Sequence, residues 1–231
     1  SVPWWVYSSN VDGHFRLFGS FSKSVCEIHG SALEFRCACG IGYANGEPRL
    51  GNLWDQWNQK ALLSTDSCKS TTMEVKLDLL CDVNRSTTTL LCRHCRQPMR
   101  PNVLMFHDTD ENVLGSIDIQ RERYQTWEGR VEDEVVQRGA NLVILEMGCG
   151  VNVPAVRQES EEVILDCVKK VSTHENNNAI AGSACLIRIN PKDAAINIDG
   201  GTFDSIPIAS TAAVALRKID RWLEALSGCE T

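Results

Sequence analysis

Hydrophobic and polar positions follow one another in regular blocks along the second half of the chain. Residues 141–147 (NLVILEM) and 185–190 (CLIRIN) are short apolar runs, followed by glycine and by proline respectively. Such runs are typical of strands that are buried on both faces of a parallel sheet. Between them, residues 161–171 (EEVILDCVKKV) repeat apolar residues at helical spacing. This order predicts a strand–helix–strand unit and therefore an α/β fold.

Two further helices and two short strands are predicted around this unit. Residues 121–138 carry an apolar stripe, as do the residues from 210 or 211 to 227, and glycine follows each stripe. Glycine is common directly after the last turn of a helix. Near the start, residues 4–8 (WWVYS) and 25–28 (VCEI) are short apolar segments with the composition of strands.

The middle of the chain has a different character. Residues 40–88 are rich in Gly, Asn, Ser and Thr and show little sustained periodicity, and a close pair of cysteines lies on each side of them. This composition favours a small inserted module over a sheet. We therefore expect a main domain formed by residues 1–36 and 99–231, with residues 37–98 as the insert.

The two cysteine pairs have the character of metal ligands. Cys92 and Cys95 form a C-x-x-C motif, whose spacing lets two thiolates bind one tetrahedral zinc ion. Cys37 and Cys39 form a shorter C-x-C pair, whose side chains point the same way in an extended backbone. These four residues predict a structural zinc site. Two more cysteines between the pairs are rival ligands, and unrelated free cysteines are the alternative.

Composition and charge narrow the class of protein. A net charge of −7 and a pI near 5.3 give no basic surface for nucleic acid. The sequence has no apolar run of the ~20 residues that a membrane-spanning helix needs. Its 11 cysteines are an odd number, whereas a complete disulfide framework would favour an even one. We expect a soluble protein of an intracellular, reducing compartment.

Polar groups follow several of the predicted strands. Asn10 and Asp12 follow the first, residues 148–150 (GCG) follow another, and Asn190 ends a third. Ligands of α/β sheets bind at the carboxyl ends of strands, where amides and carboxylates can bond ribose hydroxyls. His29 is the candidate base at a further strand end. Each signal is weak by itself, because Asn-x-Asp-Gly is common in turns and a lone histidine is more often structural.

The order of these motifs resembles that of the sirtuins, which are NAD-dependent protein-lysine deacylases. Residues 10–13 (NVDG) precede residues 27–30 (EIHG) and the first cysteine pair. The second pair precedes residues 100–108 (RPNVLMFHD), and residues 148–150 and 189–190 come later. The resemblance covers nearly the whole chain and is greatest to a divergent, bacterial-type branch. It implies a Rossmann-like parallel sheet with a small inserted zinc-binding module.

The resemblance also implies roles for the polar residues. Asn10 and His29 match catalytic positions, and His29 would accept a proton from a ribose hydroxyl of NAD. The nicotinamide side of NAD would be bound by Ser9, Asn10 and Asp12. The adenosine side would be bound by Gly148, Cys149, Gly150 and Asn190. Val103 and Phe106 match the strand that pairs with the acylated-lysine peptide or protein substrate.

The family pattern is not complete in this sequence. The Gly-rich loop that cradles the NAD phosphates has no counterpart, so the chain is either a fragment of a longer protein or has lost that half. His107 and Asp108 stand where the family has Gly and Glu, and Cys149 and Gly150 replace two hydroxyl-bearing residues. We expect NAD-dependent deacylation, in which the acyl group is transferred to ADP-ribose and nicotinamide is released. The alternative is a catalytically weak or inactive sirtuin-fold subunit of a larger assembly.

Overall fold

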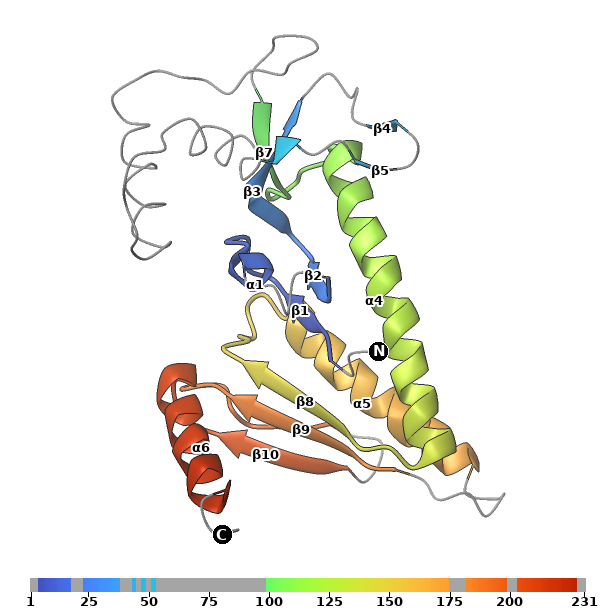
Figure 1. The fold of residues 1–231 in the computed structure, drawn as a ribbon, viewed down its shortest axis with the longest axis vertical. Helices are drawn as coiled ribbons and strands as arrows, with labels where there is room; N and C mark the ends of the chain where they lie inside the picture. Colours follow the sequence, from blue (N-terminus) through green and yellow to red (C-terminus); the bar gives the residue numbers. More distant parts are fainter. Residues whose placement is uncertain are drawn as a thin grey trace. The chain divides into compact units, whose positions relative to one another are not determined.

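A computed structural model gives the fold of this protein (Figure 1). It describes residues 4–17, 23–37, 43–44, 47–48, 51–52, 99–174, 182–198 and 203–227. These residues fall into two compact units, Trp5–Arg121 and Glu122–Thr231 together with Ser1–Trp4. The helix α4 (Glu111–Arg138) contributes residues to both units.

The unit Trp5–Arg121 begins with a parallel strand pair. Strand β1 (Val6–Ser8) pairs with β2 (Val25–Glu27), so that Ser8 lies opposite Glu27. The short helix α1 (His14–Leu17) lies between them in sequence. Parallel pairing places the carboxyl ends of both strands at the same edge, and these ends lead to the Asn10 loop and to His29.

An antiparallel sheet follows in the same unit. Strand β3 (Gly30–Cys37) lies between β6 (Gly51–Asn52) and β7 (Met99–Val103). Strands β4 (Tyr43–Ala44) and β5 (Glu47–Pro48) form a separate pair.

Gly30 makes the sharp corner between β2 and β3 possible. Its φ is +80°, and a Cβ atom at this position would lie 2.1 Å from the Asn102 carbonyl oxygen of β7. A side chain at position 30 would therefore collide with backbone, so the corner requires glycine. His29 lies directly before this corner, so the close approach of β3 and β7 restricts the position of its backbone.

The unit that contains Glu122–Thr231 holds a parallel sheet of order β10-β9-β8. Its strands are β8 (Leu142–Met147), β9 (Ala184–Ile189) and β10 (Asp204–Ile208). Helix α5 (Ala155–His174) connects β8 to β9, and α6 (Ala212–Ser227) follows β10. The core of this unit joins α5 to β9 and consists of Ile164, Cys167, Ala184 and Leu186.

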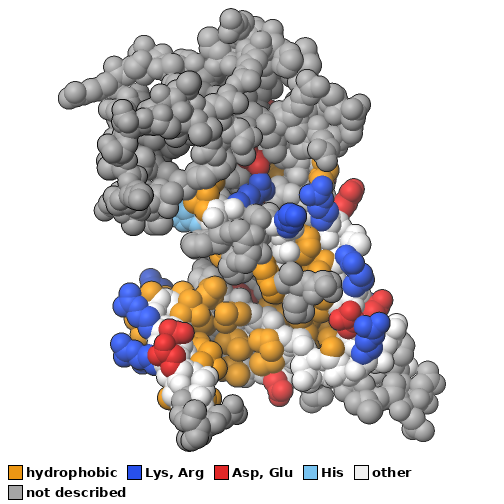
Figure 2. Space-filling model, viewed as in Figure 1, with side chains coloured by type: hydrophobic (Ala, Val, Ile, Leu, Met, Phe, Trp, Pro, Cys, Tyr) orange, Lys and Arg blue, Asp and Glu red, His pale blue; other side chains and the backbone are white. Residues whose placement is uncertain are grey.

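The two faces of this sheet differ. Leu142 and Ile144 of β8 pack against the core that α5 contributes. The alternating residues Val143, Leu145 and Met147 are on the opposite face and are exposed. Helix α6 also exposes apolar side chains, and Figure 2 shows hydrophobic side chains gathered over this sheet and α6.

The predicted α/β class with parallel strands is confirmed. The strands expected at 141–147 and 185–190 are β8 and β9, and the helix expected between them is α5. Cys167 is 1% exposed and packs as a small hydrophobic residue. Helix α4 begins ten residues earlier than predicted, at Glu111.

Three features differ from the prediction. Strand β10, which contains Pro207, was not predicted; it lies at the edge of the described part of the sheet, where proline is tolerated. Strand β3 was not expected either. Residues 40–88 were predicted to form no sheet, yet β4, β5 and β6 lie within them.

The predicted metal module lies largely outside the described residues. This applies to Cys39, Cys92, Cys95 and the side chain of Cys37, so the zinc site and the division at residues 37–98 stay predictions. Within the described ranges, no group of three or more His, Cys, Asp or Glu side chains could hold a metal ion. Four cysteines in these ranges are free thiols: Cys26, Cys149, Cys167 and Cys185. None of the described helices is both long enough and apolar enough to cross a membrane.

Candidate functional site

The loop after β1 carries the first candidate residues. The Ser8 hydroxyl accepts a hydrogen bond from the Asn10 backbone N–H at 3.1 Å. The Asp12 carboxylate accepts one from the His14 N–H at 3.0 Å, which caps α1. Gly13 is buried with a φ of +67°, so a residue with a side chain would be strained there. The side chains of Asn10 and Asp12 are exposed, and both can contact a ligand.

His29 lies against the same loop. Its Nδ1 atom is 3.2 Å from the Ser9 carbonyl oxygen, and the residue is half-buried. A carbonyl oxygen only accepts hydrogen bonds, so Nδ1 carries the proton and Nε2 has the free lone pair. The Ala32 N–H donates to the Val11 carbonyl at 2.7 Å, which joins the loop to the strand after His29. The structure therefore brings His29 beside the loop of Asn10 and Asp12.

Buried charges lie next to this arrangement. The Arg16 guanidinium forms ion pairs with Glu27 of β2, at 2.6 Å, and with Glu34 of β3. Its Nη2 donates to Gln120 Oε1 of α4 at 2.9 Å. Burial raises the pKa of Glu27 to about 7, although the positive charge of Arg16 opposes this shift. Asn102 donates to Glu34 at 2.8 Å. The sequence analysis did not predict this network. The sequence does contain a sign of it, namely two glutamates, Glu27 and Glu34, that each lie between apolar residues.

The candidate substrate residues lie at the end of β7. Val103 pairs with Gly30 of β3 and is half-buried. Phe106 is 91% exposed in a tight turn whose next residue, His107, has a φ of +63°. The Arg100 guanidinium pairs with Asp108 across this turn and lowers the pKa of that carboxyl to about 2. The turn thus presents an apolar side chain in the same unit as His29.

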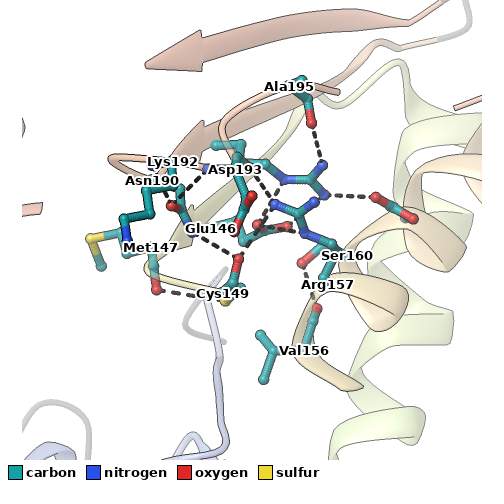
Figure 3. A network of polar contacts seen from close by, with 12 residues as sticks. Glu146, Met147, Cys149, Val156, Arg157, Ser160, Asn190, Lys192, Asp193 and Ala195 are labelled. Carbon is teal, nitrogen blue, oxygen red and sulfur yellow. Dashed lines mark hydrogen bonds and ion pairs between the residues drawn. The ribbon is translucent and has the colours of Figure 1, made fainter. Parts of the chain in front are cut away.

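The second group of candidates lies at the end of β8. Gly148 has a φ of +70°, and a Cβ atom there would meet nothing within 4 Å. Its N–H donates to the Ile189 carbonyl at 2.9 Å. The Asn190 side chain donates to the Cys149 carbonyl at 2.9 Å and accepts from the N–H groups of residues 192 and 193 (Figure 3). Asn190 is 6% exposed, so its amide is used to hold the loops together.

Two arginines stabilise this second strand end. Arg188 of β9 forms two hydrogen bonds to Glu146 of β8, at 2.7 and 2.8 Å, and one to Glu161 of α5 at 2.8 Å. Arg157 of α5 donates to the Cys149 carbonyl at 3.4 Å and to the Asp193 carbonyl (Figure 3). The turn is therefore fixed from both the sheet and the helix.

The thiol of Cys149 is not a good nucleophile. Burial raises the pKa of this thiol to about 11, and the negative charge of Glu146 contributes to the increase. The thiol therefore stays protonated near neutral pH. Its place in the turn is compatible with the predicted contact to NAD, but not with thiolate chemistry.

The predicted site residues thus form two groups. Those expected for nicotinamide, catalysis and the peptide lie in the unit Trp5–Arg121: Ser9, Asn10, Asp12, His29, Val103 and Phe106. Those expected for adenosine lie in the unit with Glu122–Thr231: Gly148, Cys149, Gly150 and Asn190.

Comparisons with known proteins give weak similarity to sirtuin structures. No family model matches the chain, and no curated protein matches it. A structure described as "The Structural basis for Sirtuin Substrate affinity" matches with 19% identity and a TM-score of 0.39, over 94% of this chain and 64% of that chain. A second, "Structure of Sir2Tm bound to a propionylated peptide", matches with 18% identity and a TM-score of 0.41, over 94% of this chain and 63% of that chain. The chain thus spans less than two thirds of either structure.

Proposed function

We propose that this protein is a sirtuin-like, NAD-dependent protein-lysine deacylase in which His29 is the general base. The observation that carries the proposal is the position of the His29 ring against the Ser9 carbonyl, at 3.2 Å from Nδ1. With Nδ1 as the donor in this contact, Nε2 is the basic atom, and the same unit exposes Asn10 and Asp12. A histidine ring against a loop that exposes an amide and a carboxylate suits a ribose ligand.

The residues fit the cofactor on the nicotinamide side. When bound, NAD supplies a ribose carbon from which nicotinamide can leave. The Asn10 amide and the Asp12 carboxylate are exposed groups that can bond the nicotinamide ribose. His29 Nε2 would accept a proton from a ribose hydroxyl, while the contact of Nδ1 with the Ser9 carbonyl orients the ring.

The adenosine side and the substrate are assigned to the turn after β8 and to the turn after β7. The open space at Gly148 and Gly150 leaves room for a ligand to approach the backbone. The exposed ring of Phe106 offers an apolar contact for an acylated-lysine peptide. A structural zinc ion bound by four thiolates, from Cys37, Cys39, Cys92 and Cys95, is proposed from the sequence spacing. A reducing intracellular compartment is proposed from the odd number of cysteines.

The test is release of nicotinamide from NAD in the presence of an acyl-lysine peptide. We expect His29→Ala to lower the rate about 100-fold or more, because the variant removes the general base. The matched control is His174→Ala, at the last residue of α5, which should retain the rate. Circular dichroism would verify that both variants fold. An unchanged rate in His29→Ala would remove this residue from the mechanism.

The alternative function is that of a non-catalytic sirtuin-fold subunit. The observation that favours it is the internal use of the Asn190 amide, which is bonded to Cys149 and to the following loop. Calorimetry with NAD separates the two functions. Binding in the micromolar range, weakened by Asn10→Ala, is expected for the enzyme, whereas absence of binding would favour the subunit.

A further inference from the structure

We propose that Arg16 is a positioning residue, which holds the Asn10–Asp12 loop and the His29 corner in one fixed arrangement. The effect of Arg16 on catalysis rests on the proposed function, whereas the structural role of Arg16 does not. Arg16 belongs to α1, the four-residue helix that directly follows the loop, and no residue of α1 is buried. A segment this short and exposed needs an anchor to keep a defined place.

Arg16 supplies that anchor through three groups on three other elements. Its Nε atom is 2.6 Å from Glu27 of β2, its Nη1 contacts Glu34 of β3, and its Nη2 donates to Gln120 of α4 at 2.9 Å. A guanidinium is planar and presents five N–H donors in a fixed fork. It donates hydrogen bonds to Glu34 and Gln120 while its charge pairs with Glu27, whose Oε2 atom has no hydrogen-bond partner among the described residues. A lysine ammonium on a flexible stem cannot make the same set of contacts.

The same contacts reach β2, the strand that leads into the turn with His29. Glu27 lies two residues before His29, and its backbone N–H donates to Gln120 Oε1 at 3.1 Å. Gln120 thus accepts from both Arg16 and the Glu27 backbone. A displacement of α1 would disturb these shared bonds, so the loop and the histidine are mechanically coupled.

The charges make this anchor strong. Glu27 is 2% exposed and Glu34 is 8% exposed, so neither carboxylate is well hydrated. Asn102 donates to Glu34 at 2.8 Å and contacts Ser116 of α4, which extends the network to β7. Loss of the arginine would remove the cation from two buried acidic side chains, of which Glu27 is partly protonated near neutral pH because its pKa is about 7. Breaking a buried ion pair costs most when only one partner is removed.

The experiment compares Arg16→Lys with the wild-type chain by amide hydrogen exchange and by steady-state kinetics. The first readout is the Ala32 amide, which donates to Val11 and reports whether the loop is held. We expect its exchange to accelerate about 10-fold or more, whereas the Leu186 amide in the other unit should not change. We also expect KM for NAD to rise about 10-fold with little change in kcat, because binding of the ribose is weakened first.

Two further variants show whether the geometry of the guanidinium or only its positive charge holds the loop in place. Arg121→Lys is the matched control, since Arg121 is an exposed arginine paired with Asp118 on α4, and it should leave both readouts unchanged. The combined variant Arg16→Met, Glu27→Gln, Glu34→Gln removes the buried charges together. If it restores slow exchange at Ala32, Arg16 only balances charge and the proposal is overturned; we expect fast exchange to persist.

The outcomes also separate this proposal from the proposed function. Unchanged exchange at Ala32 in Arg16→Lys would overturn the positioning role whether or not the chain cleaves NAD. Faster exchange in a protein that shows no NAD cleavage would support the positioning role and contradict the deacylase. Faster exchange with unchanged KM and kcat would overturn the link between the anchor and the site.

Discussion

The two loops that follow parallel strands use the same components in opposite ways. The loop after β1 and the turn after β8 each contain a glycine with a positive φ, at Gly13 and Gly148. An arginine accompanies each of them. After β1, Arg16 belongs to the short helix that continues the loop and reaches inward to buried carboxylates. After β8, Arg157 comes from α5 and donates to a carbonyl of the turn itself.

The difference decides which side chains remain available for a ligand. Asn10 and Asp12 are exposed, while Arg16 of the adjoining helix contacts buried carboxylates. Asn190 is buried, and its amide bonds the Cys149 carbonyl and the 192–193 backbone. One loop therefore presents functional groups, whereas the other uses its amide as part of the scaffold.

The largest expected effect concerns the charged pair behind the second turn. Arg188 and Glu146 are cross-strand partners on β9 and β8, and both side chains are at most 1% exposed. Arg188→Met should lower the free energy of unfolding by about 3–5 kcal/mol, because it leaves Glu146 charged and buried. Urea denaturation would measure this. The double variant Arg188→Met, Glu146→Gln should recover part of the loss, and failure to do so would show that packing, not charge, dominates.

The next effect is a pH dependence in the other unit. Glu27 has a pKa of about 7 in the folded protein, against 4.5 for an unperturbed glutamate, chiefly because of burial. The folded state thus binds more protons than the unfolded one between these pH values. Glu27 therefore favours folding below pH 4.5 and loses this contribution as the pH rises through 7. Between these limits, we expect the free energy of unfolding to fall by roughly 2 kcal/mol.

Glu27→Gln tests this assignment. The variant cannot ionise at position 27, so the decline between pH 4.5 and 7 should become smaller by the contribution of Glu27. The remainder belongs to Glu128, whose pKa burial also raises to about 7. The matched control is Glu111→Gln at the exposed first residue of α4, which should keep the wild-type pH dependence. A decline that persists unchanged in Glu27→Gln would assign the titration to another group.

The third effect compares the two asparagines directly. Asn190→Ala removes a buried amide that makes three hydrogen bonds, so it should lower the free energy of unfolding by about 1–2 kcal/mol. Asn10→Ala changes an exposed side chain and should stay within about 0.5 kcal/mol. Thermal denaturation of both variants measures the difference. Equal losses would contradict the distinction between a presenting loop and a scaffold loop.

Much of the secondary structure could be predicted because its signals are local. Apolar runs bounded by glycine or proline identify β8 and β9, and helical spacing identifies α5 and α6. Strand β10 could not be predicted in this way, because Pro207 is acceptable only where a neighbouring strand does not need its N–H group. That condition depends on the order of strands in the sheet.

In the candidate site, too, residues with local signals could be predicted, whereas residues that depend on distant partners could not. Asn10, Asp12 and His29 could be proposed from motifs, because their chemistry is visible in the residue types. Arg16 could not, since its partner Gln120 is 104 residues away in sequence. Arg188 and Glu146 had a usable signal, namely single charges of opposite sign within the two apolar runs of β9 and β8, but only the register of the sheet pairs them.

The smallest expected effect concerns a third loop, which presents a side chain at the expense of strain. His107 has a φ of +63°, a conformation that costs a residue with a Cβ atom about 1–2 kcal/mol. The pairing of Arg100 with Asp108 and Asp110 closes the turn around it. His107→Gly should raise the free energy of unfolding by about 0.5 kcal/mol, since relief of strain exceeds the greater freedom of glycine in the unfolded chain. His107→Ala retains the Cβ atom and should give no gain. An equal gain in both variants would mean that the imidazole, and not the backbone conformation, is unfavourable, and the strain assigned to this turn would then be wrong.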